Sequence, residues 1–172
     1  MIPAFHAPRI FSMSNLYANI QEVFESLESC DLILTIGNTL RSDDGLGPFI
    51  ASELGQNKNI TVINAGSNPE NVIEDIIELK PKNILIIDAA DFKTQPGTIK
   101  LIDKEDIPET TLSTHTISLK VIAEILAQDT KAEIKFLGVQ IKSVGLGEEI
   151  CDEVKIAALR IVEEIKRRFY YA

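Results

Sequence analysis

Tryptophan is absent from the 172-residue sequence, and cysteine and histidine occur only twice each. Cys30 and Cys151 form neither a metal-binding spacing nor a disulfide framework, so we interpret both as reduced structural thiols of a cytosolic chain. Basic residues are outnumbered, with 17 lysines and arginines against 26 aspartates and glutamates. The resulting net charge of −9 disfavours nucleic acid as a partner. It suits a cation or a basic partner surface better, although solubility alone explains it equally well.

Long apolar runs are also missing. No stretch is suited to a membrane span, and residues 1–11 contain Pro3 and Pro8 but lack the basic region that begins a signal peptide. We therefore expect a cytoplasmic protein without membrane insertion. The composition, 45% hydrophobic and 25% charged, is ordinary for a globular chain, and the length predicts one domain over residues 1–172. Residues 1–30 are expected to form an N-terminal arm and helix that extend this domain.

Segments with strand and helix patterns alternate along the chain. The expected strands are 32–36, 60–63, 83–90, 98–102 and 133–139, and the expected helices are 14–29, 46–54, 69–79, 119–127 and 148–168. This alternation predicts a three-layer α/β fold, in which a mostly parallel, twisted sheet of about five strands carries helices on both faces. Segment 83–90 is the most apolar and is expected at the centre of the sheet, whereas 98–102 is expected at an antiparallel edge.

The stretch 31–48 joins a buried strand to an acidic turn. Residues 32–36 are apolar or β-branched, which is typical of a strand that is buried on both faces. Asp43 and Asp44 follow this strand, just before the next helix. Because open α/β sheets bind their ligands where strands end and helices begin, this turn is a candidate site.

Two further segments place reactive side chains near the same edge of the sheet. Asp88 stands at the end of the third strand, and His115 lies in the polar segment 103–116, whose length is typical of functional loops. Two carboxylates and an imidazole suit a divalent first-row metal such as nickel, zinc or copper, with coordination positions left open. Each residue also has a structural explanation: Asp43 or Asp44 can stabilise a helix N-terminus, Asp88 can order a loop, and His115 can lie on the surface.

Several common site motifs are missing. The sequence contains no Gly-x-Ser-x-Gly elbow, which disfavours an α/β-hydrolase, and its cysteines form no recognisable pattern with a histidine. Segment 37–42, Gly-Asn-Thr-Leu-Arg-Ser, is neither a P-loop nor a dinucleotide-binding fingerprint. Two aspartates at the position of a bound phosphate also disfavour a generic nucleotide-binding module.

Segments spread over residues 31–168 resemble, in the same order, the [NiFe]-hydrogenase maturation endopeptidases. Gly37-Asn-Thr-Leu-Arg-Ser-Asp-Asp-Gly-Leu-Gly-Pro48 is similar to their signature Gly-Asn-x-Leu-x-x-Asp-Asp/Glu-Gly-x-Gly. The further similar blocks are Gly66–Asn71, Ile86–Asp91, Pro96-Gly97, Ser113–His115 and Phe136–Gln140. The resemblance is strongest for the branch that processes the large subunit of membrane-bound, formate-hydrogenlyase-type hydrogenases.

The resemblance implies an aspartic-type, nickel-dependent endopeptidase with an α/β fold. Its substrate and protein partner would be the nickel-loaded large-subunit precursor, from which such enzymes remove a short C-terminal extension. The resemblance further implies that Asp44, Asp88 and His115 are the catalytic set and contact the nickel. That metal belongs to the precursor and serves as the recognition element, so no cofactor of the enzyme's own is expected. A monomer is the expected oligomeric state.

One position departs from the family pattern. Many members have an aspartate where this sequence has Asn64, and an amide cannot act as a carboxylate base. Either the acid is not needed at this position or the activity is altered. No serine, cysteine or threonine nucleophile is evident, so we expect water to attack the peptide, assisted by nickel or by Asp44 as base. Asp43 is expected to position the loop.

Two alternatives remain open at the level of sequence. A related peptidase that acts on another precursor would keep the same fold and the same site residues. A non-catalytic module that binds nickel or holds the precursor would also keep them, and the amide at Asn64 is its main support.

Overall fold

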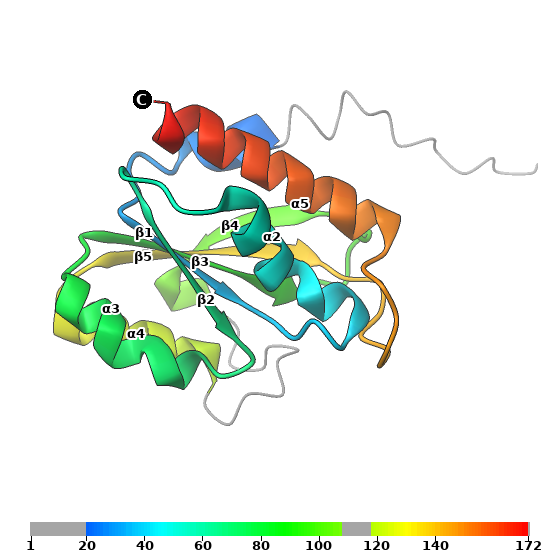
Figure 1. Ribbon diagram of the computed structural model, residues 1–172, viewed down its shortest axis with the longest axis horizontal. Helices are drawn as coiled ribbons and strands as arrows, with labels where there is room; N and C mark the ends of the chain where they lie inside the picture. Colours follow the sequence, from blue (N-terminus) through cyan, green and yellow to red (C-terminus); the bar gives the residue numbers. More distant parts are fainter. Residues whose placement is uncertain (1–19, 108–117, 172) are drawn as a thin grey trace, which may run out of the picture.

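The computed structural model describes residues 20–107 and 118–171 and contains a five-stranded sheet in the order β2-β1-β3-β5-β4 (Figure 1). The strands are β1 (Leu32–Ile36), β2 (Thr61–Gly66), β3 (Asn83–Ala90), β4 (Ile99–Asp103) and β5 (Glu133–Gln140). The α-helices are α2 (Leu46–Leu54), α3 (Ile73–Leu79), α4 (Leu119–Thr130) and α5 (Asp152–Ile165). Short helical turns are η1 (Ser42–Gly45), η2 (Pro69–Val72), η3 (Lys104–Asp106) and the π-helical η4 (Lys166–Tyr170), and residues 20–25 are also helical.

The sheet is mostly parallel. β1 pairs in parallel with β2 and β3, and β3 pairs in parallel with β5. β4 is antiparallel to β5 and forms one edge, as the sequence predicts. β3 is the central strand, which agrees with its apolar sequence. Because four strands run in the same direction, their carboxyl ends share one edge of the sheet, which we call the carboxyl edge.

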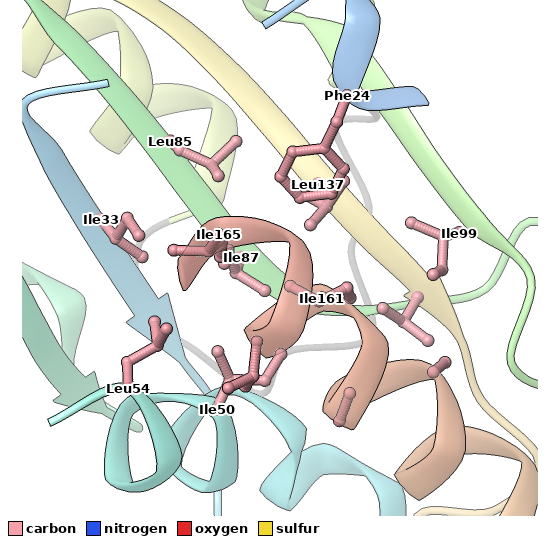
Figure 2. Close-up of a cluster of buried hydrophobic side chains, with 14 of the residues drawn as sticks. Phe24, Ile33, Ile50, Leu54, Leu85, Ile87, Ile99, Leu137, Ile161 and Ile165 are labelled. Atoms are coloured by element: carbon pink, nitrogen blue, oxygen red, sulfur yellow. The ribbon is translucent and has the colours of Figure 1, made fainter. Parts of the chain in front are cut away.

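Helices cover both faces of the sheet, which gives the expected three layers. The α2, α5 and 20–25 helices share one apolar cluster, in which Ile161 of α5 and Ile50 of α2 pack over Ile33 and Ile87 of the sheet (Figure 2). The α3 and α4 helices share the cluster on the opposite face. Each fully buried aliphatic side chain contributes roughly 1.5–3 kcal/mol, so these two clusters are the main stabilising feature. No described helix combines the length and the apolar character that crossing a bilayer requires.

The residues at 20–25 pack against the end of the chain. Phe24 is buried in the cluster beneath α5, and Arg168 Nη1 donates a hydrogen bond to the Phe24 carbonyl oxygen at 2.8 Å. Within the described residues this helix ends at residue 25, earlier than the expected 14–29, because the chain turns at Ser26. The part of the expected arm and helix that precedes residue 20 lies outside the described residues.

Three other expected helices have different bounds in the structure, and the bounds of β2, β4 and β5 differ from the expected ones by one to three residues. The expected helix 69–79 is divided into η2 and α3, and α4 continues three residues further than expected. The last helix begins at Asp152 instead of residue 148, because residues 142–151 form a loop that is bound to η1. We call this segment the 142–151 loop.

Candidate functional site

The turn η1 lies at the carboxyl edge, and two glycines allow it to pack closely on β1. Gly37 has φ of +149°, and a Cβ built on it would lie 2.0 Å from the Asp44 carbonyl oxygen. That carbonyl accepts a hydrogen bond from the Asn38 backbone N–H at 2.9 Å. A Cβ on Gly47 would lie 2.0 Å from the Ile36 carbonyl oxygen. The two glycines therefore hold the acidic turn and the start of α2 directly against the end of β1.

Asp88 lies within β3 rather than after it, on the face that α3 and α4 cover. It pairs with Gly138 of β5, and its neighbours on the same side of the strand, Ile86 and Ala90, belong to the α3/α4 cluster. Its side chain is 1% exposed. One oxygen, Oδ1, accepts a hydrogen bond from the Ala89 backbone N–H at 2.8 Å, whereas Oδ2 is buried without a hydrogen-bond partner among the described residues.

Asp44 and Asp88 are electrostatically coupled, as expected of carboxylates at neighbouring strand ends. Asp44 is only 6% exposed. Burial raises the pKa of Asp88 well above its ordinary value, the Asp44 carboxylate raises it further, and only the hydrogen bond from Ala89 opposes this change. Two buried carboxylates that interact in this way favour a bound proton or a cation, because either compensates their charge.

His115, the third predicted site residue, lies outside the described residues. The described residues that flank its segment are Ile107, which is buried in the α3/α4 cluster, and Ser118, whose Oγ accepts a hydrogen bond from the Val121 backbone N–H at the start of α4. Both flanks therefore belong to the same face of the sheet as Asp88. Without His115, the described part of the chain gathers no group of three or more histidine, cysteine, aspartate or glutamate side chains that suits a metal ion.

Asp43 is fully buried and binds the 142–151 loop. Its Oδ2 accepts hydrogen bonds from the backbone N–H groups of Lys142 (2.7 Å) and Ser143 (3.0 Å), and its Oδ1 accepts one from the Cys151 N–H (2.8 Å). The Cys151 thiol also donates to Oδ2 at 3.4 Å. Burial raises the pKa of this thiol to about 11, and the Asp43 carboxylate adds to the effect, so the thiol stays protonated and remains a donor.

Gln140, which sequence reasoning did not single out as a site residue, holds the segment that follows Asp88. It is 5% exposed at the end of β5, and its Oε1 accepts hydrogen bonds from the backbone N–H groups of Phe92 (2.7 Å) and Thr94 (3.2 Å). Its Nε2 donates to Asp91 Oδ1 at 3.1 Å. A polar residue that ends an apolar run, here Phe136–Val139, is the signal that points to such a role.

Asn64 lies on the opposite face of the sheet from Asp88. It pairs with Thr35 in the register of β1 and β2, and Thr35 Oγ1 lies 3.5 Å from Asn64 Oδ1. Thr35 follows the same alternation as Ile33, which packs under α2 and α5. Asn64 Oδ1 also accepts a hydrogen bond from the Gly66 backbone N–H at 3.0 Å. The amide therefore shapes the end of β2 and does not face the coupled aspartates.

An open groove of about 530 Å³ borders η1 between α2 and the 142–151 loop. Its lining includes Leu40, Phe49 and Ile150, together with Glu149 and Lys155. Leu40 is 66% exposed, and the nearby loop residue Leu146 is 80% exposed. The acidic turn therefore lies next to an accessible surface with both apolar and charged side chains.

Comparisons with known proteins agree on one family. A family model described as hydrogenase maturation protease matches residues 49–168. The chain is 36% identical over 139 residues to the hydrogenase 3 maturation protease of Escherichia coli K12, covering 79% of this chain and 88% of that protein. It is 33% identical over 163 residues to a putative hydrogenase maturation protease of Methanocaldococcus jannaschii, covering 84% and 96%.

Two solved structures of similar fold are those of proteins of the same type. The crystal structure of the [NiFe] hydrogenase maturation protease HycI from Thermococcus kodakarensis superposes with a TM-score of 0.74 at 28% identity and covers 86% of this chain and 96% of that one. The solution structure of the endopeptidase HycI from Escherichia coli gives a TM-score of 0.73 at 35% identity, with coverage of 81% and 90%. The α/β architecture described above is thus the architecture of these proteins.

Proposed function

The chain belongs to the HycI family of hydrogenase maturation proteases, and on this premise we propose that it removes the C-terminal extension from a nickel-loaded [NiFe]-hydrogenase large-subunit precursor. The nickel of the precursor is the recognition element, and the enzyme contributes no cofactor of its own. The observation that carries this proposal is the coupled, buried pair of Asp44 and Asp88 at the carboxyl edge.

The charge of this pair supports recognition of a cation. Asp88 Oδ2 is buried and lacks a hydrogen-bond partner among the described residues, so a cation that arrives with the substrate would supply the missing interaction. Carboxylates and imidazole form a mixed oxygen and nitrogen set that nickel accepts. We assign Asp44, Asp88 and His115 to this contact, with the metal remaining part of the substrate.

Peptide hydrolysis at this site needs an attacking water molecule and a group that takes its proton. We assign the base to Asp44, because a carboxylate has two oxygens and can contact the cation through one and the water through the other. The water oxygen bonds to the scissile carbonyl carbon, the carbon–nitrogen bond breaks, and the proton passes to the leaving amine. The substrate's nickel lowers the pKa of a bound water or polarises the carbonyl, which assists the attack.

The position of Asn64 bears on the alternative of a non-catalytic holding module. That alternative rested on the loss of a carboxylate, but Asn64 contacts Thr35 on the face opposite Asp88. The amide therefore leaves the proposed catalytic pair complete. We further propose that the enzyme acts as a monomer in the cytoplasm. Its two free cysteines, one buried and one half-buried, support the cytoplasmic location.

The decisive experiment incubates the purified chain with nickel-loaded and nickel-free precursor and follows the precursor by mass spectrometry. We expect a mass decrease equal to the C-terminal extension with the nickel-loaded precursor only. Asp88→Ala and His115→Ala should each abolish it, whereas His6→Ala, a change of the other histidine of the sequence, should not.

Each other result overturns a defined part of the proposal. Equal cleavage of both precursors contradicts recognition through nickel. Full activity of Asp88→Ala and of His115→Ala contradicts the site. Stable binding of the precursor without any mass decrease identifies a holding module instead of a peptidase.

A further inference from the structure

The turn 39–45 and the 142–151 loop are joined along their length. The Gly147 backbone N–H donates to the Leu40 carbonyl oxygen at 2.9 Å, and Ser42 Oγ donates to the Glu149 carbonyl oxygen at 3.0 Å. The Asp43 backbone N–H donates to the Ser143 carbonyl oxygen at 3.2 Å. Asp43 lies at the centre of this set of hydrogen bonds and contributes both its backbone and its side chain.

The contacts of Asp43 require a carboxylate in particular. Its two oxygens receive three backbone N–H groups and one thiol, and every one of these partners is a donor. A carboxylate only accepts, so it satisfies all four at once. An asparagine would place its NH₂ group against at least one of these donors in either orientation, because both oxygen positions are occupied by donors.

The loop that Asp43 holds forms a wall of the groove that borders η1, the turn that also contains Asp44. Gly147, Glu149 and Ile150 of the loop line this groove, and Leu40 lines it from the turn. Asp43 is also the direct neighbour of Asp44 within η1, and both are buried. Its hydrogen bonds therefore fix the position of the turn that contains Asp44 relative to the loop that forms the groove wall.

We propose that Asp43 is a positioning residue for the precursor: it holds the 142–151 loop in register with Asp44, so that the groove and the acidic pair receive one substrate together. This inference rests on the proposed function, because it assigns the groove to the chain of the precursor. Asp43 touches neither the nickel nor the scissile bond. It acts through the position of the loop, whereas the backbone of Asp44 keeps its own hydrogen bonds to Asn38 and Arg41.

The opposite edge of the sheet offers a matched control. Asp31 Oδ2 accepts hydrogen bonds from the backbone N–H groups of Lys82 (2.8 Å) and Asn83 (2.9 Å). This arrangement repeats the bonds that Asp43 Oδ2 makes to two consecutive residues. Asp31 is the residue directly before β1, at the amino ends of the parallel strands. It therefore lies at the edge of the sheet opposite to Asp44 and Asp88.

The test compares Asp43→Asn with Asp31→Asn in steady-state cleavage of nickel-loaded precursor. For Asp43→Asn we expect KM to rise about tenfold or more while kcat stays within about threefold of wild type, since the groove and the cation contact act in binding. For Asp31→Asn we expect both constants to stay within about twofold. Amide hydrogen exchange should accelerate at Lys142, Ser143 and Cys151 in Asp43→Asn only.

The possible results separate the inference from the function on which it rests. If wild type does not cleave the precursor, the proposed function fails. If wild type cleaves and Asp43→Asn retains the wild-type KM, or loses activity only in proportion to its unfolded fraction, the positioning role is wrong.

A second pair of variants tests the same network in case Asp43→Asn does not fold. Cys151→Ala removes the thiol donor but keeps the backbone bond, whereas Cys151→Ser keeps a donor at the same position. We expect a two- to threefold rise of KM for Cys151→Ala and recovery of the wild-type KM in Cys151→Ser. Cys30→Ala is the control, because Cys30 Sγ donates to the Leu32 carbonyl oxygen (3.4 Å), next to Asp31. Equal KM values in all three variants would contradict the proposal.

Discussion

At each of the two edges of the sheet, an aspartate accepts hydrogen bonds from two consecutive backbone N–H groups, but the two aspartates differ in their exposure to water. At the amino edge, Asp31 accepts two consecutive backbone N–H groups in a place that water reaches, because Asp31 is exposed. At the carboxyl edge, Asp43 accepts two consecutive N–H groups and two further donors with 0% of its surface exposed. Water can replace a lost bond at the first edge but not at the second. The aspartate whose hydrogen bonds water cannot replace is thus the one beside the proposed site.

The carboxyl edge also contains a feature that the amino edge lacks. Asp88 is buried beside Asp44, and burial raises its pKa together with the charge of its neighbour. Burial of two interacting carboxylates lowers stability, and a proton or a cation would offset this cost. In the proposed function, the carboxyl edge is therefore organised for a ligand, whereas the amino edge is organised for the fold.

The largest expected difference between the edges is in catalysis. Asp44→Asn keeps the size of the side chain but removes its charge and its capacity to act as base, so cleavage of nickel-loaded precursor should fall by about a thousandfold. Asp31→Asn makes the same chemical change at the other edge and should leave cleavage within about twofold. Single-turnover cleavage, followed by mass spectrometry, measures both. Comparable losses in the two variants would remove the functional distinction between the edges.

The next effect concerns stability. Asp43→Asn places an amide against buried donors, and we expect the free energy of unfolding to fall by about 2–3 kcal/mol. Asp31→Asn should lower it by about 0.5–1 kcal/mol, because solvent satisfies the exposed donors. Urea denaturation followed by circular dichroism gives both values. An equal decrease would show that burial does not distinguish the two aspartates.

The third prediction concerns a substitution, Asp88→Asn, that should raise stability, although most substitutions lower it. In the unfolded chain Asp88 loses its proton near its ordinary pKa of 3.8, whereas in the folded state it keeps the proton to a higher pH. Between these two pKa values the folded state binds more protons, so the contribution of Asp88 to stability decreases as the pH rises. Asp88→Asn does not titrate and resembles the protonated form.

At pH 7.5 this variant should therefore unfold at a higher temperature than wild type, by about 2–4 °C, the change that roughly 1 kcal/mol produces in a chain of this size. The difference should vanish towards pH 4. Thermal unfolding of the metal-free proteins at several pH values provides the measurement. A lower Tm of Asp88→Asn across the whole range would contradict the assignment of Asp88 as an uncompensated buried acid.

The smallest effect is expected at Asn64, at the end of β2 on the other face. Asn64→Asp restores the residue that many family members have, yet its oxygen would still accept the hydrogen bond from Gly66. We expect cleavage to stay within about twofold of wild type and stability to change by about 0.5 kcal/mol or less. A large gain of activity, seen in the same precursor assay, would show that an acid on the α2 face takes part in the reaction.

Much of the fold was predictable from local pattern. The bounds of β1, α2 and β3 agree with the predicted 32–36, 46–54 and 83–90, because buried apolar runs and the glycines at both ends of α2 decide them locally. The antiparallel edge of β4 was also predicted correctly. For the site residues, strand direction alone predicted that Asp44 and Asp88 lie close enough to interact. His115 lies outside the described residues and remains a prediction.

What sequence did not predict depends on contacts between distant segments. The start of α5 at Asp152 follows from the hydrogen bonds that Asp43 makes to the preceding loop, and no periodicity reports such bonds. The role of Gln140 depends on the segment after β3, which lies 46 to 48 residues earlier. The face on which Asn64 lies follows from its pairing with Thr35 across β1 and β2.

Asp43 and its hydrogen-bond partners lie far apart in the sequence, and this separation affects when during synthesis the groove can form. The hydrogen bonds of Asp31 join residues that are 51 and 52 positions apart in the sequence, but those of Asp43 join residues that are 99 to 108 positions apart. During synthesis the amino edge can form while the rest of the chain is still being made. The groove wall cannot form until the 142–151 loop has left the ribosome, and long closures are reached late in folding. If the groove binds the precursor as proposed, a nascent chain that already contains Asp44 and Asp88 is unable to bind it until the 142–151 loop has been made.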